Sequence, residues 1–488
     1  MTPPLLLHGA TVITVDADRR ILDDGAVLVT DGLITAVADT AEVLATADRS
    51  VRRIDCHGKV LIPGLVDAHG HAGHSLVKTL GCDSPTFWMQ TVTGAYFHAT
   101  TPDYWYHDGL VSALERVRAG VTCAVSVMGS RPRSDDPELA LAHARAYREI
   151  GIRDLICVGP AGLPLPYPVT HWSDGHPRRR TIGFDDMLAG AEAVIETVQG
   201  KNDDRTSVFL TPFTIIASVD PSHPSNPDVA THLTDDDRYQ ARRIREAAAR
   251  WGVRIHSDAF GGMVRLAATD PDHALLGPDV HLQHCIGLSA DEVQILAATG
   301  THVGHAPGGR APVPHMLAAG ITVAITTDGS SPRRPFDLLQ AARSAQAAQQ
   351  LLAHDPYLLP PGRLLEMITI DAAKTLGLDD VLGSIEIGKR ADLAVVDMRK
   401  PHLVPNWMPV HRLMYEATGA DIDTVIVGGD LVMEHRRVLG VDEPAALTAA
   451  EEQARLLVER AGLAGHLTDP GWRCNRREFD APIAVPAW

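Results

Sequence analysis

Two histidines, His69 and His71, lie two residues apart directly after the apolar run KVLIPGLVDA. Such a run is typical of a buried strand, and side chains at positions i and i+2 of a strand point to the same side. Both imidazoles would then face one point, as a chelating pair must. With 24 histidines among 488 residues, the pair alone does not distinguish a metal site from surface histidines beside a glycine turn.

Further histidines and one aspartate end other apolar segments: His256 in VRIHSD, His284 in VHLQHC, His305 in THVGHAP and Asp328 in ITTDGSS. One such residue is usually structural, whereas the whole set favours a shared site. Zinc and ferrous iron both accept neutral imidazole and carboxylate oxygen, and a catalytic site keeps one position open for water. We therefore expect one divalent metal ion, zinc first and iron as the alternative, with four ligands: His69, His71, His256 and Asp328.

The remaining polar residues of this set suggest catalytic roles. A coordinated water has its pKa lowered from ~15.7 toward ~7, and Asp328 could take its proton and pass it to a leaving group. His284, off the metal, would polarise the substrate or orient the attacking hydroxide. We assign His305 and Trp88 to substrate binding, although a solvated loop is the default position for Trp88 and for its neighbour His74.

The elements that must position these residues form a regular series between about Pro63 and Gly377. Amphipathic segments separate the apolar ones, and one of them, SADEVQILAATG, begins with a capping box at Ser289 and Glu292 and closes on Gly300. Eight strands, each followed by a helix or a long connection, predict an α/β fold with a (β/α)₈ barrel, in which catalytic residues lie at the C-terminal ends of the strands. The predicted strands are GLVDAH, VTCAVSV, IRDLICV, TSVFLTP, VRIHSD, VHLQHC, THVGHA and ITVAITTD, the fourth resting on SVFLTP alone.

Both ends of the chain consist of short alternating runs separated by Asp and Gly, which is typical of antiparallel strands. We expect them to build one β-sandwich that flanks the barrel. The predicted division is residues 1–62 and 383–445 for the two parts of the sandwich, 63–382 for the barrel, and 446–488 for a C-terminal helix and tail.

Composition limits the partners. The formal net charge of −17 argues against nucleic acid or an anionic membrane as partner. The dense basic run, HPRRR, is expected to decorate a long Pro-rich loop after strand three, which would serve as a lid or an oligomer contact. Six scattered cysteines and the absence of a signal-like or membrane-spanning segment predict a reduced, cytoplasmic protein. We expect a small-molecule substrate and a homodimer or larger homo-oligomer.

The order GLVDAHGH, IHSD, QHC, TTDGSS, then GSIEIGKRADLAVVD and TVIVGGDLV, resembles the amidohydrolase superfamily, and more narrowly its mononuclear ATZ/TRZ-type and cytosine deaminase-like hydrolases. The resemblance covers roughly Leu5 to Leu439. It implies the barrel and sandwich, a divalent metal at the four ligands named above, and a catalytic His284. Binuclear members carry a bridging lysine carbamate or glutamate at strand four, and SVFLTPFTII contains neither residue, so a single metal is favoured.

The chain departs from this family pattern at two places. Deaminases of this type carry a glutamate three residues after the strand-five histidine, where this chain has Ala259, and the histidine-proline-serine-asparagine element after strand seven is shortened to HAPGGRAP. Asp258, two residues after His256, would replace the glutamate as proton shuttle. Equally, it would accept the spare N–H of a ligand histidine.

The sequence thus predicts a metal-dependent hydrolase of a non-peptide carbon–nitrogen bond in a small, cyclic nitrogen compound. Hydrolytic deamination of an aminoheterocycle by metal-activated water is the leading hypothesis. Ring opening of a cyclic amide or imide, or another amide hydrolysis, is the alternative, which the missing glutamate favours. A non-catalytic scaffold on the same fold is the remote alternative.

Overall fold

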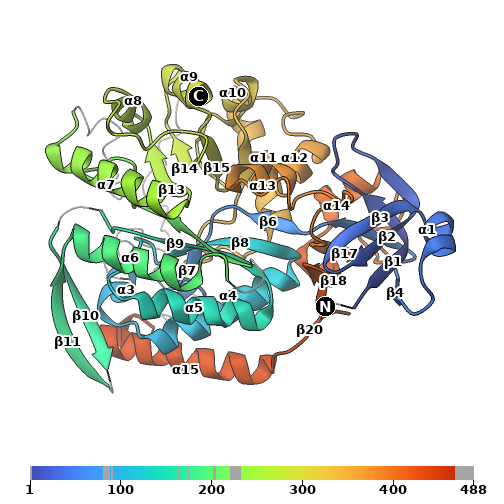
Figure 1. Cartoon of the computed structure of the whole chain (residues 1–488), viewed down its shortest axis with the longest axis horizontal. Helices are drawn as coiled ribbons and strands as arrows, with labels where there is room; N and C mark the ends of the chain where they lie inside the picture. Colours follow the sequence, from blue (N-terminus) through green and yellow to red (C-terminus); the bar gives the residue numbers. More distant parts are fainter. Residues whose placement is uncertain are drawn as a thin grey trace, which may run out of the picture.

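The computed structural model describes residues 3–80, 88, 92–162, 165–173, 175–201, 205–219 and 232–467. A parallel barrel surrounded by helices lies beside a separate sheet that contains the N-terminal strands (Figure 1). All eight predicted barrel segments form strands, the fourth included, which confirms the predicted fold class. In barrel order they are β6 (Leu65–Asp67), β8 (Val121–Met128), β9 (Arg153–Val158), β12 (Thr206–Leu210), β13 (Ile255–Phe260), β14 (Val280–Ile286), β15 (His302–His305) and β16 (Val323–Ile325).

The barrel closes where the first strand meets the last. A short strand, β7 (His71–Ala72), extends the line of β6 and pairs with β8. A parallel bridge joins Gly70 to Asp328, and the Asp328 N–H donates to the carbonyl of His69 at 3.0 Å. The first and last strands therefore bring His69, His71 and Asp328 to one seam.

Helices follow the barrel strands as predicted. The predicted capping box is present at α9, where the Glu292 N–H donates to the Ser289 hydroxyl at 3.3 Å and Gly300 ends the helix with φ +70°. The C-terminal helix α15 lies along α4 (Figure 1). The α-helices are α1 (Thr40–Thr46), α3 (Thr93–His98), α4 (Pro102–Arg118), α5 (Pro137–Ile150), α6 (Phe184–Val198), α7 (Asp235–Trp251), α8 (Met263–Ala268), α9 (Ala290–Thr299), α10 (Val313–Ala318), α11 (Leu338–Ala353), α12 (Pro361–Met367), α13 (Ile370–Leu376), α14 (Pro409–Glu416) and α15 (Glu443–Ala461).

Both chain ends build the flanking sheet together, as predicted. The two ends meet where β5 pairs antiparallel with β17 and parallel with β1, and hydrogen bonds join all the strands into one nine-stranded sheet. Its strands are β1 (Leu5–Ile13), β2 (Ile21–Thr30), β3 (Leu33–Asp39), β4 (Arg52–Asp55), β5 (Lys59–Pro63), β17 (Leu393–Asp397), β18 (Ile422–Val427), β19 (Asp430–Glu434) and β20 (Arg437–Val438).

Two ion pairs, one of them buried, connect this sheet to the N-terminal ends of the barrel strands. Arg153, the first residue of β9, contacts both carboxylate oxygens of Asp392 at 2.9 and 3.0 Å. Both side chains are at least nine-tenths buried. Arg205, directly before β12, pairs with Asp430 and donates to the carbonyl of Val427 at 3.1 Å.

The segment after strand three is a hairpin, so the prediction of a loop there is wrong. Strands β10 (Tyr167–Ser173) and β11 (His176–Ile182) pair antiparallel throughout. Two contacts anchor the hairpin: the ring of Tyr167 lies 4.7 Å from that of Phe97, and His171 Nε2 lies 2.7 Å from an Asp135 oxygen. The basic run lies in β11, which is exposed from His176 to Thr181, so water solvates its arginine side chains.

Two further expectations concern cysteines and membranes. The four cysteines in the described ranges, Cys56, Cys123, Cys157 and Cys285, are buried free thiols. The other two, Cys82 and Cys474, lie outside the described residues. Within those same ranges no helix combines the length and the apolar character needed to cross a bilayer.

Candidate active site

Three ligand atoms converge at the seam of the barrel. Nε2 of His69 and Nε2 of His71 are 3.2 Å apart, and Oδ1 of Asp328 lies 3.5 and 3.2 Å from them. Bonds of ~2.1 Å to a tetrahedral zinc place neighbouring ligand atoms ~3.4 Å apart. The three atoms are thus spaced as the ligands of one small cation are.

Hydrogen bonding and burial set the form of these ligands. The His71 Nδ1–H donates to the carbonyl of Gly129 at 2.7 Å, which leaves Nε2 as the nitrogen directed at the site. Burial lowers the pKa of His69 to about 3, so this imidazole is neutral, as a metal ligand must be. Burial opposes protonation of His71, but the Asp328 carboxylate outweighs it and raises the pKa of His71. The space between His71 and Asp328 therefore favours a positive charge.

Asp328 is ionised although it is buried. Burial opposes its charge, but Arg334 together with His69 and His71 holds the pKa of Asp328 well below its usual range. Arg334 forms an ion pair with the carboxylate oxygen that faces away from the histidines. The sequence did not predict Arg334, because an arginine six residues after Asp328 carries no local signal.

His256 contacts the cluster from the other side of His69. Its Nε2 lies 2.7 Å from Nδ1 of His69, and its Nδ1 lies 3.2 Å from Nδ1 of His281, a buried residue of β14. Burial lowers the pKa of His256 well below its usual value. His281 was also missed, although it lies three residues before His284 and its register opposite His256 could have indicated it.

A buried carboxylate supports the backbone of Asp328. Asp67 accepts hydrogen bonds from the Thr327 N–H at 3.0 Å and the Thr327 hydroxyl at 2.6 Å, and Arg116 lies 3.4 Å away. Asp328 itself has φ +62°, a left-handed conformation that strains a residue with a side chain. We infer that Asp67 and Arg116 hold Thr327, and through it the strained ligand.

His284 reaches the site through an irregularity in its strand. In register, His256 and Asp258 of β13 lie beside His281 and Gln283 of β14, and the side chains of His281 and Gln283 fill the barrel interior. Since side chains alternate along a strand, the next residue, His284, would point outward. Instead His284 and Cys285 have φ +70° and +49°, and the register shifts by one residue there. Such a bulge re-aims a side chain beside an active site.

The redirected imidazole lies beside Asp258. The His284 Nε2 is 3.7 Å from Oδ2 of Asp258, and its ring centroid is 5.7 Å from that of His69. Burial raises the pKa of Asp258 to about 6. Residue 259, which carries the glutamate in the family pattern, is a fully buried alanine of the apolar core, so Asp258 is the carboxylate that this strand directs toward His284.

His305 packs against α11. Its side chain is buried, with Nε2 3.3 Å from the Gln349 side-chain nitrogen of α11 and with Cε1 close to Gly309. Burial lowers its pKa to about 4. These contacts are those of a packed structural histidine, and the assignment of His305 to substrate binding stays a prediction.

The solvated position expected for Trp88 and His74 is wrong, since both are buried. The His74 ring stacks on that of His71 with centroids 4.7 Å apart, and Trp88 packs edge-on against His74 at 5.3 Å. His74 Nδ1 lies against Gly329, where a side chain would leave no room for it. A buried row of aromatic rings therefore extends from His71 through His74 to Trp88.

Residues 60–432 match the model of the Amidohydrolase family. The chain is 30% identical to a 5-methylthioadenosine/S-adenosylhomocysteine deaminase of Syntrophobacter fumaroxidans, over 90% of this chain and 95% of that protein. It is 28% identical to a 5'-deoxyadenosine deaminase of Methanosarcina barkeri, over 93% and 99%.

Solved structures share the fold. A zinc-bound adenosine deaminase of Xanthomonas campestris superposes with a TM-score of 0.78 at 21% identity, covering 93% of this chain and 98% of that one. Atrazine chlorohydrolase of Arthrobacter aurescens TC1, in complex with zinc, superposes with a TM-score of 0.73 at 22% identity, covering 93% and 100%. At these identities the likeness is one of fold.

Proposed function

Because the chain belongs to the amidohydrolase family, we propose that it is a mononuclear metal-dependent enzyme that releases ammonia hydrolytically from an amino-substituted heterocycle. The prediction of a hydrolase of carbon–nitrogen bonds other than peptide bonds is confirmed by the family and by the deaminase names of its relatives. The observation that carries the proposal is the convergence of His69, His71 and Asp328, with Asp258 and His284 beside them.

The donor set fits a divalent cation. Two imidazole nitrogens and a carboxylate oxygen face one another at 3.2 to 3.5 Å. We propose that these three residues hold the ion, zinc before iron. His256, predicted as the fourth ligand, directs its Nε2 at Nδ1 of His69 and not at the three converging atoms. A bound ion of this kind lowers the pKa of a coordinated water toward ~7 and so supplies a nucleophile at neutral pH.

The protein's own groups would then move the protons. Hydrolysis adds water to the ring carbon that bears the amino group and expels ammonia. The water oxygen becomes the ring carbonyl oxygen, so both of its protons leave it, one for the ring nitrogen and one for the departing amino group. Asp328 accepts the proton of the attacking water, with Arg334 holding its other oxygen. Asp258 and His284, 3.7 Å apart, carry a proton to the ring nitrogen and to the leaving group.

The relatives suggest the heterocycle to test first. Both deaminases named above carry names of adenine nucleosides modified at the 5' position. We propose an adenine nucleoside of this type, whose 6-amino group is the leaving group.

The test is a product assay on the zinc-loaded enzyme. The panel is 5-methylthioadenosine, S-adenosylhomocysteine, 5'-deoxyadenosine and adenosine, with free ammonia and the base product measured together. We expect one ammonia per molecule converted and an intact purine ring. Absence of ammonia from every aminoheterocycle would overturn the proposal.

Ring opening of a cyclic amide or imide is the second candidate, because Ala259 replaces the glutamate of the deaminase pattern. Amide hydrolysis requires no proton transfer to an aromatic ring nitrogen. Cyclic amides and imides added to the same panel would reveal it as a ring-opened acid formed without ammonia.

A further inference from the structure

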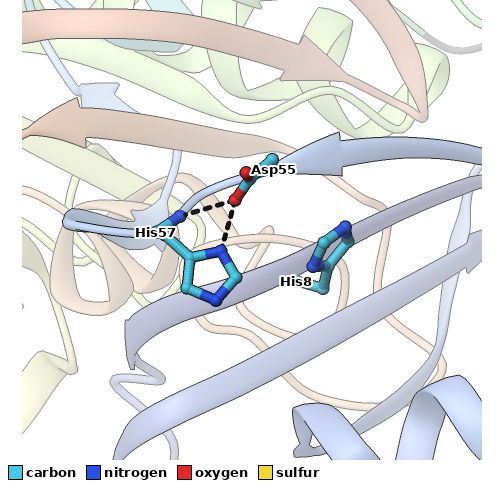
Figure 2. A group of neighbouring side chains, drawn as sticks. All are labelled: His8, Asp55 and His57. Carbon is cyan, nitrogen blue, oxygen red and sulfur yellow. Dashed lines mark hydrogen bonds and ion pairs between the residues drawn. The ribbon is translucent and has the colours of Figure 1, made fainter.

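A second group of metal-binding side chains lies on the flanking sheet, outside the barrel. His8 of β1 is paired in parallel register with Asp55 of β4, so the two side chains are cross-strand neighbours. His57 follows in the turn that leads to β5 (Figure 2). One ligand atom from each of the three residues lies within 4.8 Å of the other two.

Two of the three side chains are held in place by local contacts. Asp55 Oδ1 accepts a hydrogen bond from the His57 N–H at 3.0 Å and lies 2.5 Å from Nδ1 of the same residue, as the dashed lines in Figure 2 show. The His57 ring packs over Gly9, where a Cβ atom would lie 2.5 Å from Cε1. The missing side chain at Gly9 thus makes room for the imidazole.

His8 completes the group with an unused nitrogen. Its Nδ1 is buried and has no hydrogen-bond partner among the described residues. Its ring stands across from that of His57, with centroids 6.0 Å apart and planes at 79° (Figure 2). Burying an imidazole nitrogen without a partner costs free energy, and an ion or a water between the rings would remove that cost.

We propose that His8, Asp55 and His57 form a second divalent-cation site, which takes zinc. Two imidazoles with one carboxylate match zinc and late transition metals, whereas calcium and magnesium prefer oxygen ligands throughout. The contact between Asp55 and His57 Nδ1 is the carboxylate–histidine pairing that orients a zinc-binding ring and leaves Nε2 directed outward.

The site would fasten the turn between β4 and β5 to β1. Those strands belong to the flanking sheet, and β5 leads directly into β6, after which His69 and His71 follow. Zinc bound there stabilises the folded chain, since a ligand that binds only the folded state raises its stability. It is separate from the ion proposed at the barrel mouth.

The test counts zinc bound by the untagged enzyme whose catalytic site is already loaded. Equilibrium dialysis against added zinc, followed by elemental analysis, should show one further equivalent per chain and a higher melting temperature in zinc. His57→Ala and His8→Ala should each lose that equivalent and the rise in melting temperature, with turnover unchanged. His435→Ala is the matched control, because this exposed histidine of the same sheet also faces an aspartate, Asp423, at 3.4 Å.

Two outcomes would overturn the proposal: no further zinc in the wild type, or uptake that His57→Ala leaves intact. Asp55→Asn should weaken binding by at least ~10 to 100-fold, because it replaces a carboxylate ligand and also weakens the contact that orients His57. His71→Ala should lose the barrel ion and keep this one, so failure of the proposed function and failure of this inference give different results.

Discussion

The two ends of the barrel are built in opposite ways. At the N-terminal end, Arg153 and Asp392 form a buried two-point ion pair with both hydrogen bonds made. At the C-terminal end, His69, His71 and Asp328 direct acceptors at one another, and the positive φ angles of His284, Cys285 and Asp328 lie in the same region.

The N-terminal end of the barrel contributes mainly to stability, and the C-terminal end carries the groups suited to catalysis. At the N-terminal end, the paired charges of Arg153 and Asp392 join the barrel to the flanking sheet, and their hydrogen bonds to each other are complete. At the other end, the proposed cation would neutralise the converging side chains, and strained backbone is typical of functional sites at this end of a barrel. Substitutions at the two ends should therefore change different measurements.

The largest effect is expected for His71→Ala, which removes a ligand atom from the converging group. Metal content and turnover should both fall to background, while the far-ultraviolet circular dichroism stays that of the wild type. Full activity in the metal-free protein, or two metal equivalents that His71→Ala removes together, would contradict the single-metal site.

At the opposite end, Asp392→Ala should destabilise the protein by about 3 kcal/mol, because it leaves the Arg153 guanidinium buried without its partner. Urea denaturation measures the loss, and kcat at saturating substrate should not change. Glu434→Ala, which breaks an exposed pair with Arg52, is the control and should remain close to wild type. A lower kcat in Asp392→Ala would show that the N-terminal end of the barrel also affects catalysis.

His284→Ala should keep the metal and lower turnover by ~10²-fold or more, as removal of a positioned acid or electrostatic group does. Elemental analysis measures the metal content of this variant, and the kinetic assay measures its turnover. Loss of the metal in this variant would make His284 a ligand.

Asp258→Asn preserves shape but cannot carry a proton. A shuttle role predicts full metal occupancy with turnover lower by ~10²-fold. A role in orienting a ligand histidine predicts mainly a ~10 to 100-fold weaker metal affinity. If neither quantity changes, proton transfer falls to Asp328 and His284.

The smallest effect concerns the hairpin. Asp135 and Asp136 raise the pKa of His171 to about 9, so the contact stabilises the hairpin fully below the unfolded pKa of ~6.5. The stabilisation is lost as the pH rises through about 9. Amide exchange in β10 and β11 should then speed up a few-fold beyond its ordinary pH dependence, and His171→Gln should abolish that excess.

The sequence alone determined the barrel strands and the residues at their ends. Buried parallel strands are apolar runs that local composition reveals, so the sequence predicted all eight strands. The polar residues at the ends of these runs included the three that converge, His69, His71 and Asp328. The alternation of short runs at both chain ends likewise predicted that the two ends build one β-sandwich together, and the structure joins their strands in one sheet. These features depend on neighbours along the chain.

Tertiary structure decided what depends on neighbours across space. The bulge that turns His284 toward Asp258 is a mismatch of register between two strands, and neither strand encodes it alone. The contact of Asp67 with Thr327 joins residues 260 positions apart. The burial of His74 depends on how the chain folds back after His71. Register, strain and burial are properties of packed pairs of segments, and a sequence pattern specifies each segment singly.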